Sequence, residues 1–184
     1  MGGKLKVINL FAGPGAGKST TRAALFAELK YRGIRVEEVT EYAKDLTWDE
    51  HGSLLSDQLM ILANQNRKLE RLRNKVDLVI SDSPILLGIN YRVPGYLPSY
   101  FEKLVWELWE TYDNYNYFIN RTKKYNSYGR TQTEEEAKKL DCLIMDLLIS
   151  SQDKHSTHFS SVNGDRFAIQ IIADDIEKKV LSKD

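Results

Sequence analysis

Short apolar runs alternate with longer amphipathic segments along the whole chain. Residues 5–12, LKVINLFA, form a continuous apolar run rich in β-branched and aromatic side chains, which predicts a buried strand. Residues 18–31 carry apolar side chains at helical spacing, which predicts a helix that ends at Arg32-Gly33. Both patterns recur, so we expect further strands at residues 34–40, 77–81, 115–120 and 157–162, and further helices at 53–76, 100–112, 133–151 and 165–181.

Three local features refine this pattern. Ser53 is expected to cap the long helix, and Thr133 with Glu136 forms a capping box for the helix that follows. Residues 83–99 contain three of the four prolines and are expected to form a long, functional loop. Strands that alternate with helices from end to end are typical of a parallel sheet covered on both faces. The expected fold is therefore α/β, with a five-stranded, mainly parallel sheet.

Composition narrows the class of protein. The length of 184 residues fits one domain, residues 1–184, and Lys plus Arg balances Asp plus Glu at 26 each. The whole molecule therefore has no net field toward nucleic acid. The single cysteine, Cys142, excludes an internal disulfide, and no apolar run is long enough to cross a membrane. The first residues show no signal-peptide pattern, so we expect a cytoplasmic protein with no membrane partner.

A glycine-rich segment follows the first expected strand and opens the first expected helix. Residues 12–19 read AGPGAGKS, which matches the Walker A pattern except that Ala12 replaces its first glycine. Glycines let successive N–H groups turn toward phosphate oxygens, and the helix presents its positive end to the same anion. Lys18 is expected to reach the β- and γ-phosphates of ATP, and the Ser19 hydroxyl to ligate Mg²⁺. The residues expected to bind the nucleotide are Gly13, Pro14, Gly15, Ala16, Gly17, Lys18, Ser19 and Thr20.

Two carboxylates follow other expected strands. Asp82 ends the run at residues 78–81, as a Walker B acid does, and is expected to bind Mg²⁺ with Ser19. The alternative for Asp82 is a turn cap, because Asp-Ser-Pro is good turn chemistry. Glu41 follows the second strand and is expected to accept or orient the proton of an acceptor hydroxyl. The alternative for Glu41 is a helix cap or a surface charge.

A basic segment lies between the fourth strand and the capped helix. Residues 121–130 carry four positive charges and no acid, and we expect a short lid at about residues 121–133. Arg121 and Arg130 are expected to close over the transferring phosphoryl group, which stabilises its charge and excludes water. The alternative is a solvated basic loop.

Two other classes of P-loop protein are disfavoured. Residues 74–77, NKVD, match a guanine signature of GTPases, but they precede the third strand rather than follow a late one. An oligomeric AAA+ machine is also disfavoured, because little chain remains for its helical lid domain and trans-acting arginines. A nucleotide-dependent switch or partner-binding ATPase stays open as the alternative to a kinase, with ATP ordering residues 83–99.

Residues 12–19, 40–44 (TEYAK), 81–84 (SDSP) and Gly129-Arg130 together resemble one family. They are similar to the P-loop small-molecule kinases, as found in ribosylnicotinamide kinase domains and phage-encoded nucleotide-kinase-like proteins, some of which phosphorylate hydroxymethylated pyrimidines in DNA. The resemblance implies a P-loop NTPase fold and phosphate transfer from ATP with Mg²⁺. It also implies the roles given above for Lys18, Ser19, Glu41, Asp82, Arg121 and Arg130. By position, it implies that Asn163 in the Asn163-Gly164-Asp165 loop touches the adenine.

The acceptor is expected to be a nucleoside, a nucleotide or a modified nucleobase. Twelve of the 19 aromatic residues lie between Tyr91 and Tyr128, and tyrosines in the loops are candidates to stack a base, whereas Trp106, Trp109 and Phe118 are expected in the core. Gln58 and Gln65 lie two helical turns apart and are candidates to bond a base edge. Residues 67–75 form a second basic stretch, which is either a solvated face or, with the lid, a DNA contact. The sequence leaves ATP over GTP and a homo-oligomer undecided.

Overall fold

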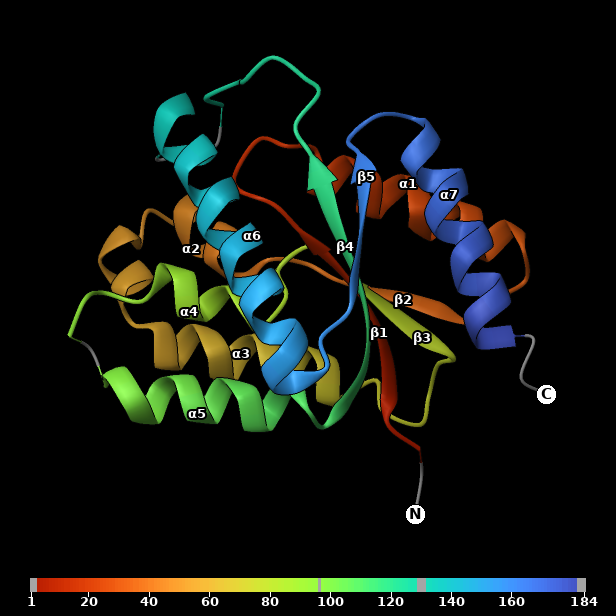
Figure 1. Cartoon of the computed structure of the whole chain (residues 1–184), viewed down its shortest axis with the longest axis horizontal. Helices are drawn as coiled ribbons and strands as arrows, with labels where there is room; N and C mark the ends of the chain where they lie inside the picture. The colour runs from red at the N-terminus through yellow and green to blue at the C-terminus, as the bar shows by residue number, and fades with distance from the viewer. Residues whose placement is uncertain (1–2, 96, 129–131, 182–184) are drawn as a thin grey trace.

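A five-stranded sheet lies at the centre of the computed structural model, which describes residues 3–95, 97–128 and 132–181 (Figure 1). The strand order is β2-β3-β1-β4-β5, and every neighbouring pair is parallel. The predicted α/β fold with a five-stranded parallel sheet is therefore confirmed. The strands are β1 (Leu5–Phe11), β2 (Val36–Val39), β3 (Leu78–Ser81), β4 (Tyr112–Asn120) and β5 (Phe159–Asn163).

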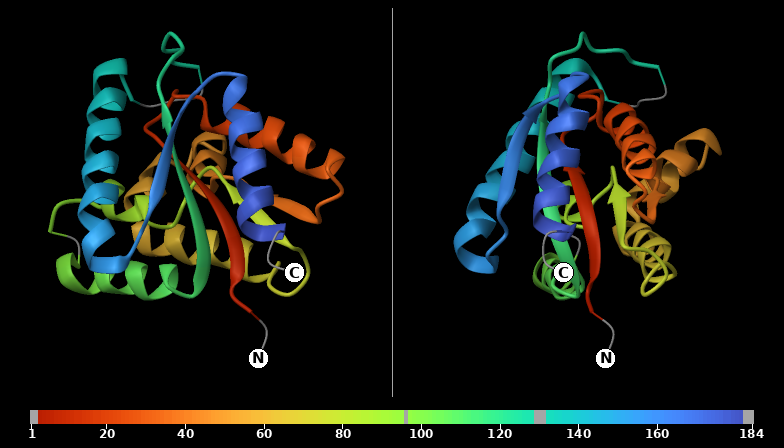
Figure 2. Two further views of the ribbon diagram at one scale, coloured as in Figure 1. Left: turned by 45° about the vertical axis from the view of Figure 1, so that its right-hand side comes forward. Right: turned by 90° about the vertical axis from the view of Figure 1, so that its right-hand side faces the viewer.

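Helices cover both faces of the sheet, as the side view in Figure 2 shows. The helices are α1 (Lys18–Tyr31), α2 (Tyr42–Trp48), α3 (Gln58–Glu70), α4 (Leu87–Tyr91), α5 (Pro98–Trp109), α6 (Glu134–His155) and α7 (Phe167–Ile176), with a 3-10 helix at Gly52–Ser56 and a π-helix at Glu177–Leu181. Side chains of β1 alternate between two cores, because successive residues of a strand point to opposite faces. Val7 and Phe11 pack with residues of α3, α5 and α6, whereas Ile8 and Leu10 pack with residues of α1 and α7.

The long helix expected at residues 53–76 is shorter at both ends. Residues Gly52–Ser56 form a 3-10 helix, and Asp57, not Ser53, caps α3 by accepting a hydrogen bond from the Met60 N–H at 3.0 Å. The helix ends at Glu70, and Asn74 adopts a left-handed conformation (φ 61°) before β3. Two short helices were not predicted: α2 and α4 lie in segments expected to be loops. Segments of seven and five residues are too short to show a helical period.

The other elements follow the prediction closely. The capping box of α6 is confirmed, because the Thr133 Oγ1 accepts from the Glu136 N–H at 3.2 Å and the Glu136 Oε2 from the Thr133 N–H at 2.7 Å. Trp106, Trp109 and Phe118 are buried in the core, as expected. In the described part of the chain, no helix is long and apolar enough to cross a membrane.

The parallel topology brings three loops to one edge. Strands β2, β3 and β1 are neighbours, and each runs the same way, so their carboxyl ends lie side by side. The glycine-rich loop follows β1, Glu41 follows β2 and Asp82 follows β3. Ligands of open α/β sheets bind at this edge.

Candidate active site

The glycine-rich loop turns sharply between β1 and α1. Gly15 (φ 78°) and Gly17 (φ 113°) both adopt left-handed conformations that other residues rarely take. A Cβ on Gly15 would also lie 3.0 Å from the Tyr125 ring and 3.3 Å from the Arg121 Nη1. Within the described residues, no side chain caps the first turn of α1, so its N–H groups remain available to an anion.

Lys18 begins α1 and points into the site. Its Nζ donates to the carbonyl oxygens of Ala12 at 2.7 Å and Gly13 at 3.1 Å, both within the loop. Burial lowers the pKa of Lys18, while the charges of Glu41, Asp82 and Asp141 oppose that shift. Four charged groups from different elements therefore act on one another around the loop.

Glu41 lies just before α2 and lines the same pocket as Lys18 and Ser19. Burial raises the pKa of Glu41, and the charge of Lys18 partly offsets this. A carboxylate with a raised pKa is a stronger base in its ionised form than an ordinary glutamate. This position fits the predicted role of Glu41 toward an acceptor hydroxyl.

Asp82 is only 3% exposed, and its two carboxylate oxygens have different surroundings. Its Oδ2 lies 3.2 Å from the Nε of Arg22 on α1, and the Nη1 of Arg22 also pairs with Glu38 on β2. Its Oδ1 is buried and has no hydrogen-bond partner among the described residues. An unpaired buried carboxylate oxygen fits a cation or its water, so the chemistry of Asp82 suits Mg²⁺. The Arg22 pairing was not predicted.

No group of three or more acidic, histidine or cysteine side chains that would hold a metal occurs in the described part of the chain. A Mg²⁺ site built from Ser19, Asp82, phosphate and water needs no such group.

Arg121 follows β4 and lies over the glycine-rich loop. Its Nε and Nη2 lie 2.9 and 2.8 Å from the Oδ2 of Asp141 on α6, and the Gly13 N–H donates to the Oδ1 of Asp141 at 2.6 Å. Asp141 thus joins the loop to the lid arginine. Asp141 was not predicted, because an acid on an amphipathic helix resembles a surface residue in the sequence. Arg130 and Gly129 lie outside the described residues.

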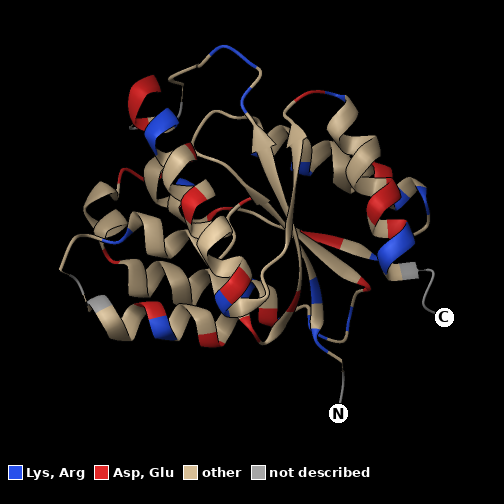
Figure 3. Cartoon of the chain, viewed as in Figure 1, with Lys and Arg blue, Asp and Glu red and all other residues tan. Residues whose placement is uncertain are grey.

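The lid segment contacts both sides of the site. Figure 3 shows its basic residues on the loop above β4. The Tyr125 hydroxyl donates to the Gln132 carbonyl, which joins the first part of the lid to the residue before the Thr133 cap of α6. The Tyr128 ring lies 5.7 Å from the Trp48 ring at the end of α2. The lid therefore spans from the glycine-rich loop to α2.

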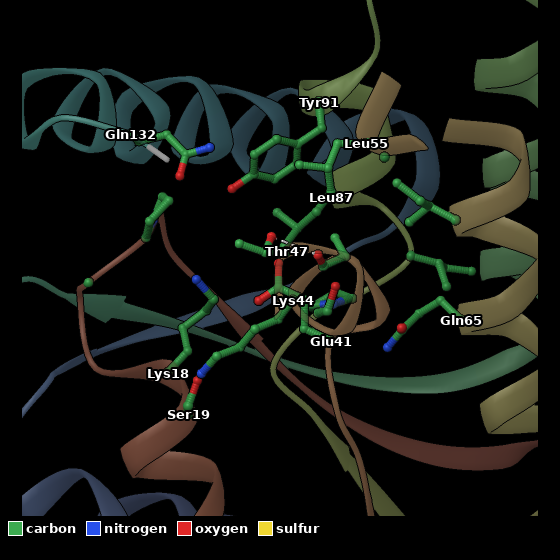
Figure 4. A pocket seen from close by; sticks show the side chains of 18 of the residues that line it. Lys18, Ser19, Glu41, Lys44, Thr47, Leu55, Gln65, Leu87, Tyr91 and Gln132 are labelled. Atoms are coloured by element: carbon green, nitrogen blue, oxygen red, sulfur yellow. Dashed lines mark hydrogen bonds between the residues drawn. The ribbon is translucent and has the colours of Figure 1, made fainter. Parts of the chain in front are cut away.

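One pocket of about 240 Å³ joins these groups (Figure 4). Pro14, Gly15, Gly17, Lys18, Ser19 and Thr20 line its phosphate end. Gly13 and Ala16 of the glycine-rich loop, and Asp82 and Arg121 beside it, do not line the pocket. The end opposite Lys18, which we call the acceptor end, is lined by Leu55, Gln58, Ile61, Leu62, Gln65, Leu87, Gly88 and Tyr91. Lys44 and Thr47 of α2 also line the pocket and were not predicted.

The tyrosines predicted to stack a base occupy different positions in the structure. Tyr91 and Tyr128 line the pocket, Tyr125 packs on Gly15, and Tyr100 is exposed on α5. Tyr96 lies outside the described residues. Gln58 and Gln65, named from the sequence as candidates to bond a base, both line the acceptor end.

Asn163 ends β5 and does not line the pocket among the described residues. Its Oδ1 accepts from the Asn120 Nδ2 at 3.4 Å. The following loop lies against the glycine-rich loop, because a Cβ on Gly164 would lie 2.6 Å from the Ala16 carbonyl oxygen. The adenine contact of Asn163 stays a prediction.

The second basic stretch, residues 67–75, is partly occupied by internal contacts. The Lys68 Nζ lies 3.0 Å from Asp45 and 3.3 Å from the Thr40 carbonyl oxygen, and Arg73 pairs with Glu70. These pairs favour a solvated face with internal ion pairs over a DNA contact at this stretch.

The chain is similar in sequence to one known protein family. The sequence model of a family described as AAA domain matches residues 7–166, which span the phosphate loop, both carboxylates and the lid. No curated protein matches the sequence. The prediction against an oligomeric AAA+ machine concerned a helical lid domain and trans-acting arginines, and it stays a prediction.

Two solved structures of Mycobacterium tuberculosis APS kinase CysC are similar to the chain. One is a cysteine-to-alanine mutant (15% identity, TM-score 0.48) and the other a complex with AMPPNP and APS (15% identity, TM-score 0.49). Each comparison covers 98% of this chain and 99% of the other.

Proposed function

Since this chain belongs to the AAA domain family and its glycine-rich loop opens into a pocket that Glu41 also lines, we propose that it is a kinase. It transfers the γ-phosphate of ATP to a hydroxyl group of a nucleoside, nucleotide or modified nucleobase. The observation that carries this proposal is that one pocket holds Lys18, Ser19 and Glu41 and then continues into the acceptor end. A switch that only hydrolyses ATP has no need of such a compartment.

The phosphate end stabilises the charge of the transferring group. The loop N–H groups and the start of α1 hold phosphate oxygens, and Lys18 donates to the β- and γ-phosphates. Arg121, held over Gly15 by Asp141, faces the same charge from the lid side, and Arg130 is proposed to join it. Asn163 is proposed to contact the adenine.

Glu41 acts on the acceptor. Its carboxylate accepts the proton of the attacking hydroxyl as the bond to phosphorus forms. Lys44 lines the same pocket, and we propose that it faces the phosphoryl group from the α2 side. Figure 4 shows Glu41 and Lys44 pointing into the pocket from one short segment, so α2 presents both groups together.

Ser19 and Asp82 are the residues that would hold Mg²⁺. The ion supplies neutralisation of the phosphate charge when it is bound. The unpaired Oδ1 of Asp82 supports this assignment, because its other oxygen is already used by Arg22.

The class of acceptor follows in part from the resemblance to ribosylnicotinamide kinase domains and phage nucleotide-kinase-like proteins. A cavity of about 240 Å³ is smaller than the ~300–1,000 Å³ of most ligand pockets, which favours a compact acceptor over a long one. Hydroxymethylpyrimidine in DNA is included among the acceptors to be tested.

The proposal is tested by transfer of labelled γ-phosphate from ATP to a panel of acceptors. The panel holds nucleosides, nucleoside monophosphates, nicotinamide riboside, and plain and hydroxymethylated DNA, with Lys18→Ala as the control. Label on one acceptor that disappears in the variant supports the kinase. Free phosphate as the sole product, with partner binding that depends on nucleotide, overturns it in favour of the switch.

A further inference from the structure

The amide of Gln65 has a fixed orientation in the acceptor end. Gln65 lies on α3, is 3% exposed and lines the pocket. Its Oε1 accepts a hydrogen bond from the Tyr42 backbone N–H at 3.2 Å. A backbone N–H can only donate, so the atom that faces it must be the amide oxygen. The Nε2 group of Gln65 is therefore the hydrogen-bond donor on the side of the amide away from the Tyr42 N–H.

This donor has no acceptor of its own. The Gln65 Nε2 is buried and has no hydrogen-bond partner among the described residues. Buried polar groups in native proteins are nearly always paired, and an exception calls for a ligand or an ordered water. In Figure 4, Gln65 lies on the opposite side of Glu41 from Lys18, so the donor is remote from the transferred phosphate.

The surroundings of the donor suit a flat ring. Ile61, Leu62 and Leu87 line the acceptor end with apolar surface, and the Tyr91 ring lines it as well. Gln58 is not a second unpaired donor at this end, because its own Nε2 donates to the Leu55 carbonyl oxygen at 2.8 Å. The compartment thus offers apolar walls and one oriented N–H group, which is the usual composition of a specific ligand site.

We propose that the acceptor carries a carbonyl oxygen at the end opposite its phosphorylated hydroxyl, and that this oxygen accepts from the Gln65 Nε2. An amino group in that place would face one donor with another and is rejected. The inference rests on the proposed function in that the hydroxyl is taken to face Glu41. Two acceptor types share this chemistry: a pyrimidine nucleoside with a 4-carbonyl group, and a pyridine riboside with a carboxamide.

The first test uses the wild-type protein and changes only the ligand. Affinity by calorimetry and kcat/KM for phosphate transfer are compared for uridine against cytidine, and for nicotinamide riboside against pyridine riboside without the carboxamide. In one pair, we expect the affinity and kcat/KM of the carbonyl-bearing member to be about 10- to 100-fold higher. The other member would leave a buried polar group unpaired, which usually costs this much. The pair that shows the difference identifies the acceptor type.

The second test changes the donor. In Gln65→Glu, one carboxylate oxygen still accepts from Tyr42 and the other presents an acceptor to the ring, so the preference should invert toward cytidine. Gln152→Glu on α6 makes the same chemical change outside the pocket and should leave the preference intact. If Gln65→Glu fails to fold, Gln65→Met removes the donor, and the wild-type preference should fall to about twofold or less.

The outcomes separate this inference from the proposed function. A carbonyl preference in binding that Gln65→Glu inverts supports the inference even if no ligand is phosphorylated, in which case the kinase proposal fails. Phosphate transfer with equal use of both members of each pair overturns the inference and leaves the kinase standing. Absence of binding by every ligand, or a preference for cytidine in the wild type, also overturns it.

Discussion

The two ends of the pocket are built in different ways. The phosphate end comes from one continuous stretch, residues 12–20, and its groups are largely backbone N–H groups oriented by glycines. The acceptor end comes from residues of the 3-10 helix, α3 and α4, which are separate segments of the sequence. A backbone cradle recognises any triphosphate, whereas side chains from three helices can change one at a time. Under the proposed function, this difference assigns the chemistry to one end of the pocket and the selectivity to the other.

The largest effect should come from the phosphate end. Lys18→Ala removes the ammonium that faces the transferring phosphate, and we expect kcat to fall by at least ~10³-fold. Labelled phosphate transfer at saturating ATP measures the loss. Lys30→Ala, at the exposed end of the same helix, is the matched control and should transfer at the wild-type rate. Transfer retained by Lys18→Ala would contradict the assignment of the phosphate end.

The boundary between the two ends is tested by Glu41→Gln. We expect kcat to fall by about 10²–10³-fold while the KM for ATP changes little, because a general base acts on the acceptor hydroxyl. The wild-type rate should also fall on acidification at a pH above the ~4.3 of an ordinary glutamate, since burial raises the pKa of Glu41. A pH–rate profile of both proteins checks this. An acid limb that survives in the variant would exclude Glu41 as the base.

The link between lid and loop should have a smaller effect. Asp141→Asn keeps an acceptor for the Gly13 N–H but removes the charge that holds Arg121, and misplacement of the guanidinium should lower kcat by about tenfold. Steady-state kinetics should show little change in the KM of the acceptor, and the melting temperature should stay close to wild type. Asp146→Asn, at an exposed position of the same helix, is the control. Equal losses in both variants would mean that the helix, not the link, was damaged.

The smallest effect concerns stability. The pKa of Glu41 is raised in the folded protein, so its ionised form opposes folding at neutral pH. The protonated form is favoured below the unfolded pKa of ~4.3, and that contribution is lost as the pH rises through the folded pKa. Glu41→Gln should therefore be more stable than wild type at pH 8 by about 1 kcal/mol, a rise in Tm of ~2–4 °C, and equal to it near pH 4. Thermal melts at both pH values measure the difference, and a variant that is less stable at pH 8 would contradict the burial argument.

The sequence predicted the phosphate end better than the acceptor end, for a physical reason. The geometry of residues 12–19 is determined by the glycines within that segment. The parallel strand pattern was enough to predict that Glu41 and Asp82 lie at the same edge of the sheet. Asp141, Arg22 and Lys44 act through contacts between elements, and nothing in their own neighbourhood distinguishes them from surface charges. Helices α2 and α4 were missed because they are too short to show a period, yet they carry Lys44 and Tyr91 into the pocket. The role proposed for Gln65 depends on a backbone N–H of another element, which no sequence pattern reveals.

The contact between Trp48 and Tyr128 should make the fluorescence of Trp48 sensitive to the position of the lid. Trp48 is 53% exposed and lies against the lid, whereas Trp106 and Trp109 belong to α5 and are buried in the core. A change in lid position would therefore alter the fluorescence of one tryptophan against two constant ones. Titration of the unlabelled protein with nucleotide, then with acceptor, would record lid movement in real time, and Trp48→Phe would identify the source of the signal.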